Sequence, residues 1–181
     1  MKTRAQIAEP ILRTVAQSLA SAAGIDPDAL DAERIAWTIE TRRRRLQLLD
    51  PDAYLEYLNS SSDELDHLID ALVIQETRFF RDQAVFEQIR VWANSTPASG
   101  RPSLRILSAP CSTGQEAYSV GAVLRLAGIP LARFTIDAFD ISRAAISTAR
   151  RAIYPARALE HVPEELRRVT GELKRSVAYP R

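Results

Sequence analysis

The chain has 181 residues, of which 46% are hydrophobic and 26% are charged, and its formal net charge is +1 at pH 7. This composition is typical of a globular protein with a hydrophobic core and excludes a disordered or collagen-like chain. The small net charge provides no overall attraction to nucleic acid or to an anionic membrane. The single cysteine, Cys111, cannot form an internal disulfide, and neither a signal peptide nor a run near the ~18 apolar residues of a transmembrane helix is visible. We therefore expect a cytoplasmic protein that does not insert directly into membranes.

The first half of the chain is predicted to be helical. Its apolar residues recur at helical spacing, as in Ile11, Val15 and Leu19. An aspartate followed by a proline, at Asp26 and again at Asp50, is typical of a helix start, because the carboxylate caps the first turn and proline fits the first helical position. We expect about four or five short helices in this half.

A stretch rich in proline, glycine and serine, residues 94–103, is the best candidate for a domain boundary. The elements expected after it are a strand at 104–109, a helix at 117–127, a strand at 134–139 and a helix capped by Ser142. This alternation favours a parallel sheet with right-handed crossovers. We predict no clear strand after residue 154. Because two parallel strands leave an unpaired edge and uncovered apolar surface, we expect a fragment, a truncated relative or a chain completed by a partner.

The loop from Ser108 to Glu116 follows the first predicted strand and consists mainly of small residues. Open α/β sheets bind ligands at this end of a strand, where loop amides face the crevice. The loop has only Gly114 as a glycine and matches no nicotinamide or triphosphate fingerprint. Asp140 ends the second strand, where a carboxylate can accept hydrogen bonds from ribose hydroxyls. From spacing alone, an ordinary strand-to-helix turn and a helix-capping role for Asp140 remain open alternatives.

The sequence gives little support for a nucleophilic cysteine or for histidine metal ligands. Cys111 lacks the elbow motif, the phosphate-loop arginine and the neighbouring base that a nucleophilic cysteine needs. His67 and His161 lack metal-ligand spacing, so no metal site is predicted.

Four successive arginines, Arg42 to Arg45, lie in one predicted helix. At about 100° per residue they cover most of the helix circumference, so at least one must pair with a carboxylate or lie over apolar surface. The cluster predicts either a docking face for an acidic partner or a solvated helix face. Nucleic acid is disfavoured because the cluster lacks interleaved aromatic residues and the chain is not basic overall.

Several segments resemble, in order, motifs of the CheR-type chemotaxis methyltransferases. QETRFFRD at 75–82 is similar to N-E-T-x-F-F-R-D, and SAPCSTGQEAYS at 108–119 is similar to S-A-x-x-S-T-G-E-E-P-Y-S. AFDIS at 138–142 resembles A-x-D-I-D, and ARRAIY at 149–154 resembles A-R-x-G-x-Y. Upstream, 50–58 resembles the small helical domain of that family.

The resemblance implies an α/β fold in which a small N-terminal helical domain precedes a partial Rossmann-like S-adenosylmethionine-dependent methyltransferase domain. The expected divisions are the helical domain at 1–74, a connecting helix and linker at 75–103, and an incomplete cofactor-binding domain at 104–181. The family's later N-x-x-Y motif is missing from this sequence. We therefore expect the complete protein, and not this chain alone, to catalyse methyl transfer.

The resemblance also implies roles for individual residues. The residues matching cofactor-contacting motif positions are Gln75, Thr77, Arg81, Glu116 and Asp140. Arg81 would in addition lie beside the incoming glutamate and act in catalysis, where a fixed cation offsets converging carboxylates. Arg42, Arg43 and Arg45 would match the surface that docks the cytoplasmic helices of a chemotaxis receptor.

The implied activity is transfer of a methyl group from S-adenosylmethionine to receptor glutamate side chains. A non-catalytic signalling module that binds a receptor or a response regulator is the alternative, and a small-molecule methyltransferase on the same scaffold is a third reading. The sequence departs from the family motifs at four positions, and each departure weakens a polar contact or a turn. Gln75 replaces asparagine, Gln115 replaces glutamate, Ala117 replaces proline and Ser142 replaces aspartate.

Overall fold

The computed structural model describes residues 7–73, 75–95, 103–170 and 177–178. The chain separates into two compact units, Met1–Ile74 and Gln75–Arg181, which are described here one at a time. Residues 96–102, the middle of the predicted linker, lie outside the described residues, as do 171–176 and 179–181 of the predicted cofactor-binding domain. In the described part of the chain, no helix is both long and apolar enough to cross a membrane.

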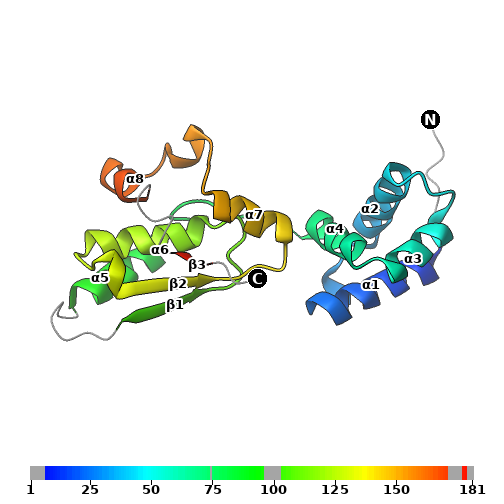
Figure 1. Ribbon diagram of the computed structural model, residues 1–181, viewed down its shortest axis with the longest axis horizontal. Helices are drawn as coiled ribbons and strands as arrows, with labels where there is room; N and C mark the ends of the chain where they lie inside the picture. The colour runs from blue at the N-terminus through cyan, green and yellow to red at the C-terminus, as the bar shows by residue number, and fades with distance from the viewer. Residues whose placement is uncertain (1–6, 74, 96–102, 171–176, 179–181) are drawn as a thin grey trace. The chain divides into compact units, whose positions relative to one another are not determined.

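The first unit is a small helical bundle (Figure 1). Its elements are α1 (Glu9–Ala23), the 3-10 turn η1 (Pro27–Ala29), α2 (Ala32–Arg45), α3 (Pro51–Ser60) and α4 (Ser62–Leu72). The two predicted aspartate caps, Asp26 and Asp50, lie where η1 and α3 begin. Asp50 caps α3 by accepting a hydrogen bond from the amide of Ala53, and Ser61 caps α4 through the amide of Glu64. Gly24 ends α1 with a φ of 62°, a left-handed conformation that costs glycine little.

The core of this unit follows the helical periodicity of the sequence. Four side chains are fully buried in one cluster where the helices pack together: Val15 and Leu19 of α1, Ile39 of α2 and Leu68 of α4. Each lies on the apolar stripe of its own helix, so burial of these stripes is what holds the four helices together. Tyr54 of α3 is also fully buried, although it carries a hydroxyl that needs a partner.

The second unit combines helices with a parallel sheet. Its elements are α5 (Gln83–Ser95), β1 (Leu104–Ser108), α6 (Gln115–Leu126), η2 (Leu131–Arg133), β2 (Phe134–Ala138), α7 (Arg143–Arg151), η3 (Ala156–Leu159), α8 (Glu164–Thr170) and β3 (Val177–Ala178). The expected strand-helix-strand-helix order is confirmed, and the fold is a helical segment followed by part of a Rossmann-like domain. One prediction was wrong: β3 follows residue 154, but two residues are too short to produce a recognisable strand pattern.

The sheet has the strand order β1-β2-β3, and both pairings are parallel. Ile106 pairs with Ile136, which in turn pairs with Val177. Figure 1 shows α5, α6 and α8 on one side of the two long strands, and this side buries Phe134 and Ile136. The opposite side carries exposed residues such as Leu107, which is 66% exposed. The carboxyl ends of β1 and β2 thus lie side by side, and the two loops that leave them are neighbours.

Candidate functional site

The loop between β1 and α6 is held in an unusual conformation at the carboxyl edge of the sheet. Ser112 has a φ of 47° and Gly114 has a φ of 93°, so two residues within this short turn are left-handed. A non-glycine residue adopts this conformation only where its surroundings enforce it. The enforcing contacts come from the end of β2: the amide of Cys111 donates to the Phe139 carbonyl at 2.7 Å, and the amide of Ser112 donates to Asp140 Oδ2 at 2.7 Å.

Asp140 is partly buried and organises both loops. Its Oδ2 accepts from Ser112, while its Oδ1 accepts from the amide of Ser142 at 2.9 Å. Ser142 is the residue that caps α7, through a hydrogen bond from the amide of Ala145 to its hydroxyl. A carboxylate has roughly four acceptor positions, so about two remain for hydroxyl donors. Asp140 can therefore hold the two loops and still accept hydrogen bonds from the two hydroxyls of a ribose.

The segment that precedes α5 reaches the same loop. Ser112 Oγ donates to Gln75 Oε1 at 2.8 Å. Gln75 therefore binds the side chain of Ser112, while Asp140 binds its backbone amide. Phe79 is fully buried, and the amide of Phe80 donates to Ser119 Oγ on α6 at 3.0 Å. These contacts fix residues 75–80 against the loop after β1 and against Ser119 of α6.

One more of the selected residues, Glu116, lies at this edge. Glu116 is exposed in the first turn of α6, and its Oε1 accepts a hydrogen bond from Ser108 Oγ at 2.7 Å. Gly114 begins α6 without a side-chain cap, which leaves a helix N-terminus that favours negative charge. Thr77 is partly buried on the segment that carries Gln75.

Arg81 is bound within its own segment. Its guanidinium donates to the Glu76 carbonyl at 2.9 Å and to Glu76 Oε2 at 3.3 Å, and its side chain is 59% exposed. An ion pair this exposed contributes little stability and exchanges readily with other anions. Arg81 is therefore accessible to a ligand carboxylate.

The arginine cluster of α2 is divided between internal and exposed side chains. Arg42 forms two hydrogen bonds, of 2.8 and 2.6 Å, with the carboxylate of Glu64, whose side chain is 2% exposed. Arg43 binds Glu40 with two nitrogens and the carbonyls of residues 48 and 49 with a third. Arg45 is exposed, and within the described part of the chain it makes no ion pair. The expectation that at least one arginine pairs with a carboxylate or lies over apolar surface is met by pairing, with Glu64 and Glu40.

Cys111 is unsuited to nucleophilic chemistry. Its side chain is 1% exposed, and burial, with the nearby carboxylate of Asp140, raises the pKa of the thiol to about 12. The thiolate that attacks electrophiles is therefore scarce at neutral pH. Among the described residues, no group of three histidine, cysteine, aspartate or glutamate side chains could hold a metal ion.

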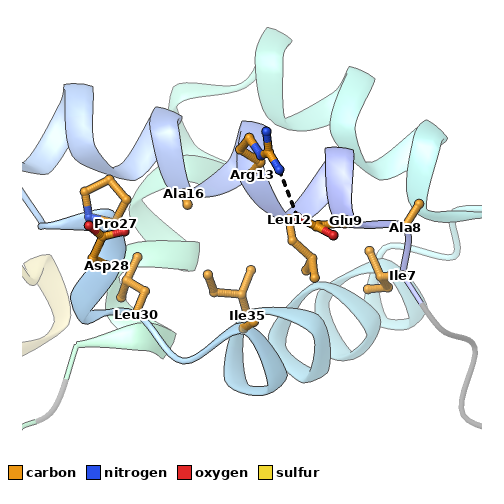
Figure 2. Close-up of a pocket in the computed structure, with 11 residues that line it drawn as sticks. Ile7, Ala8, Glu9, Leu12, Arg13, Ala16, Pro27, Asp28, Leu30 and Ile35 are labelled. Atoms are coloured by element: carbon orange, nitrogen blue, oxygen red, sulfur yellow. Dashed lines mark hydrogen bonds and ion pairs between the residues drawn. The ribbon is translucent and has the colours of Figure 1, made fainter.

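The helical unit contains an open groove beside α1 (Figure 2). Its lining residues are Ile7, Ala8, Glu9, Leu12, Arg13, Ala16, Pro27, Asp28, Leu30, Ala32 and Ile35. Figure 2 shows the ion pair between Arg13 and Glu9 at its rim, where the two side chains are 2.8 Å apart. Of the residues that the structure describes, the groove includes none that the sequence analysis selected.

Comparison with known proteins decides the family. Residues 75–176, more than half of the chain, match the family described as "CheR methyltransferase, SAM binding domain". The chain belongs to the CheR methyltransferase family. The matched region contains the loop after β1, Asp140 and the 75–82 segment, and the cofactor of this family domain is S-adenosylmethionine.

Individual CheR-family relatives match at moderate identity. The chain is 38% identical over 138 residues to the "Probable biofilm formation methyltransferase WspC" of Pseudomonas aeruginosa, covering 75% of this chain and 33% of that protein. It is 35% identical over 132 residues to "Chemotaxis protein methyltransferase 2" of Pseudomonas aeruginosa, covering 69% of this chain and 46% of that protein. The "Chemotaxis protein methyltransferase" of Escherichia coli is 30% identical over 172 residues, which cover 93% of this chain and 59% of that protein. The chain thus spans between a third and three fifths of these relatives.

The side chains at the sheet edge suit the chemical groups of S-adenosylmethionine. The free acceptor positions of Asp140 suit the two ribose hydroxyls, and the uncapped start of α6 suits a carboxylate. Sequence reasoning missed Ser108 and Ser112, which contact Glu116, Gln75 and Asp140. The run Ser112–Thr113–Gly114 was the available signal, because small polar residues before a helix often supply loop contacts.

Proposed function

We propose that this chain is the front part of a methyltransferase that transfers the methyl group of S-adenosylmethionine to glutamate side chains on the cytoplasmic helices of a chemotaxis receptor. The observation that carries the proposal is the junction at Ser112, where Gln75 and Asp140 bind one residue of the loop after β1. This junction joins three segments that resemble family motifs, 75–82, 108–119 and 138–142, and the family match covers all three.

The proposed roles follow from the groups each residue presents. Asp140 accepts the ribose hydroxyls, and Glu116 and Gln75 line the cofactor from α6 and from the 75–82 segment. Thr77 and Arg81 approach the methionine end, where Arg81 exchanges the Glu76 carboxylate for that of the cofactor or the substrate. Bound S-adenosylmethionine supplies an electrophilic methyl group on a positively charged sulfur.

The protein's contribution to such a reaction is mainly positional. A glutamate carboxylate is already a nucleophile at neutral pH, and a neutral thioether leaves, so no general base is required. Proximity and alignment of the two reactants then account for most of the rate enhancement. Arg81 acts in catalysis by holding a second carboxylate near the first without the repulsion that two anions would otherwise feel.

Receptor docking is assigned to the basic face of α2. The contacts made by this helix support unequal roles for Arg42, Arg43 and Arg45. Arg45 is exposed and available to an acidic partner, whereas Arg42 and Arg43 use their guanidinium groups inside the helical unit. We therefore propose that Arg45 contributes direct contacts and that Arg42 and Arg43 keep the docking helix in place.

Methyl transfer is tested with radiolabelled S-adenosylmethionine and a cytoplasmic receptor fragment, using the full-length protein. Labelling of the fragment that disappears when its methylation-site glutamates are changed to alanine supports the proposal. Cofactor binding without labelling of any receptor fragment favours the non-catalytic signalling module or a small-molecule methyltransferase. Arg81→Ala should abolish labelling, with Arg78→Ala, a neighbouring exposed arginine, as the matched control.

A further inference from the structure

Tyr154 lies at the end of the segment after α7, and its hydroxyl donates to the Thr113 carbonyl at 2.6 Å. The two residues are 41 positions apart, so the contact depends on tertiary structure. Thr113 stands between the two left-handed residues of the loop, Ser112 and Gly114. The phenol therefore binds the loop at the residue between its two left-handed positions.

The ring of Tyr154 is fixed by two other aromatic rings. Phe79 contacts it edge to face, with ring centroids 5.0 Å apart and an interplanar angle of 84°. Tyr118 of α6 meets it at 6.2 Å and 73°. The carbonyl of Phe79 is in turn hydrogen-bonded to His161 Nε2 at 2.8 Å. Tyr154 thus connects the loop to the 75–82 segment through Phe79 and to α6 through Tyr118.

The other contacts of the loop leave this one without a substitute. Ser112 is held by Asp140 and Gln75, and Cys111 is held by the carbonyl of Phe139. Within the loop, the amide of Gly114 donates to the Cys111 carbonyl at 2.9 Å, and the hydroxyl of Thr113 donates to Gln115 Oε1 at 2.7 Å. None of these contacts reaches the carbonyl of Thr113. Among the described residues, Tyr154 is the one side-chain donor to the Thr113 carbonyl. Burial raises the pKa of this phenol, so it stays protonated and remains a donor across the working pH range.

We infer that Tyr154 is a positioning residue for cofactor binding, which holds the Thr113 peptide so that the loop after β1 presents a preformed surface to S-adenosylmethionine. This inference rests on the proposed function. A loop that is already ordered loses less conformational freedom when a ligand binds, and binding is tighter for that reason. Without the phenol, the strained turn at Ser112 relaxes and must be reordered by the ligand.

The test compares two substitutions that remove the same group. Tyr154→Phe deletes the hydrogen bond to the loop, whereas Tyr118→Phe deletes a hydrogen bond of 2.9 Å to the carbonyl of Ala149 in α7. Both variants keep the aromatic ring and lose one phenol-to-backbone bond in the same unit. A purely structural role would lower the melting temperature in both variants and would affect ligand binding equally.

Isothermal titration with S-adenosylhomocysteine, the reaction product, provides the decisive readout. Tyr154→Phe should weaken binding about three- to tenfold, and Tyr118→Phe by less than about twofold. Equal affinities of Tyr154→Phe and the unaltered chain, or equal losses in both variants, would overturn the inference. If the unaltered chain binds no S-adenosylhomocysteine, the proposed function fails and the positioning role fails with it.

Amide hydrogen exchange gives an independent measurement should Tyr154→Phe lose stability. The inference predicts faster exchange at the amides of Ser112 and Gly114 in Tyr154→Phe, at a denaturant concentration far below unfolding, and no such change in Tyr118→Phe. Uniformly faster exchange throughout the unit in Tyr154→Phe would show that the phenol stabilises the fold without a specific effect on the loop, and would refute the positioning role.

Discussion

Replacing Arg42 by alanine should destabilise the helical unit substantially although arginine is usually a surface residue. Arg42 is 12% exposed and binds Glu64, which is 2% exposed, through two hydrogen bonds. The substitution leaves the Glu64 carboxylate buried with the hydroxyl of Tyr54, at 2.9 Å, as its remaining side-chain donor in the described structure. Breaking a buried ion pair in this way costs about 3–5 kcal/mol.

The expected loss lies at the lower end of that range, about 3 kcal/mol, because water can reach the space vacated by a partly exposed guanidinium. Urea unfolding is the assay. The chain has two tryptophans, and Trp37 lies in α2, so Trp92→Phe makes fluorescence report on the helical unit alone. Arg45→Ala is the matched control, since Arg45 is exposed in the same helix and its loss should cost less than about 0.5 kcal/mol.

A second substitution separates the cost of an orphaned charge from the loss of packing. Arg42→Met combined with Glu64→Gln should be more stable than Arg42→Met alone by about 1–2 kcal/mol, because the neutral amide is cheaper to bury than the carboxylate. A loss below about 1 kcal/mol for Arg42→Ala, or additive effects in the double variant, would refute the conclusion that Arg42 and Glu64 form a coupled buried pair.

Other contacts give further predictions. The Arg43 and Arg44 guanidinium groups hold the pKa of the Glu40 carboxyl below its usual value, so the stability it contributes is present at neutral pH and is lost as the pH falls through the lowered pKa. Glu40→Gln should therefore destabilise the unit by about 0.5–1 kcal/mol at pH 7 and by less in acid, as measured by urea unfolding at both pH values; a difference that grows in acid would contradict this. Cys111, with its raised pKa and 1% exposure, should react with iodoacetamide at pH 8 far more slowly in the folded than in the urea-unfolded chain, and equal rates would show that the thiol is accessible. Ser142→Ala should lower stability by about 1 kcal/mol in thermal unfolding through loss of the α7 cap, whereas Ser147→Ala, within the same helix, should have a smaller effect.

The sequence predicted the elements whose signals are local. Asp26 and Asp50 mark the helix starts that they cap, and the apolar run around Ile136 marks a strand that is buried in the sheet. Each signal depends on neighbouring residues alone. The strand β3 could not be predicted in this way, because two residues carry no periodicity and their pairing with β2 depends on the rest of the fold.

The contacts that organise the candidate site depend on residues distant in the chain. Helix geometry predicted that one arginine of α2 must pair with a carboxylate or lie over apolar surface. It did not predict the partner, because Glu64 lies 22 residues beyond Arg42 and only tertiary packing brings them together. In the same way, Gln75 lies 37 residues before Ser112, and Tyr154 lies 41 residues after Thr113. Family motifs indicated which segments matter, and the structure shows which atoms join them.

The most direct test of the account is isothermal titration of this chain with S-adenosylhomocysteine, comparing Asp140→Ala with Asp137→Ala. Asp137 is the matched control because it also lies near the end of β2, where its carboxylate pairs with Arg105 at 2.7 Å. The account predicts binding by the unaltered chain, a loss of about a hundredfold in Asp140→Ala, and little change in Asp137→Ala. Absence of binding by the folded, unaltered chain, or equal binding by the two variants, would contradict the claim that the edge of the sheet at Asp140 is the cofactor site.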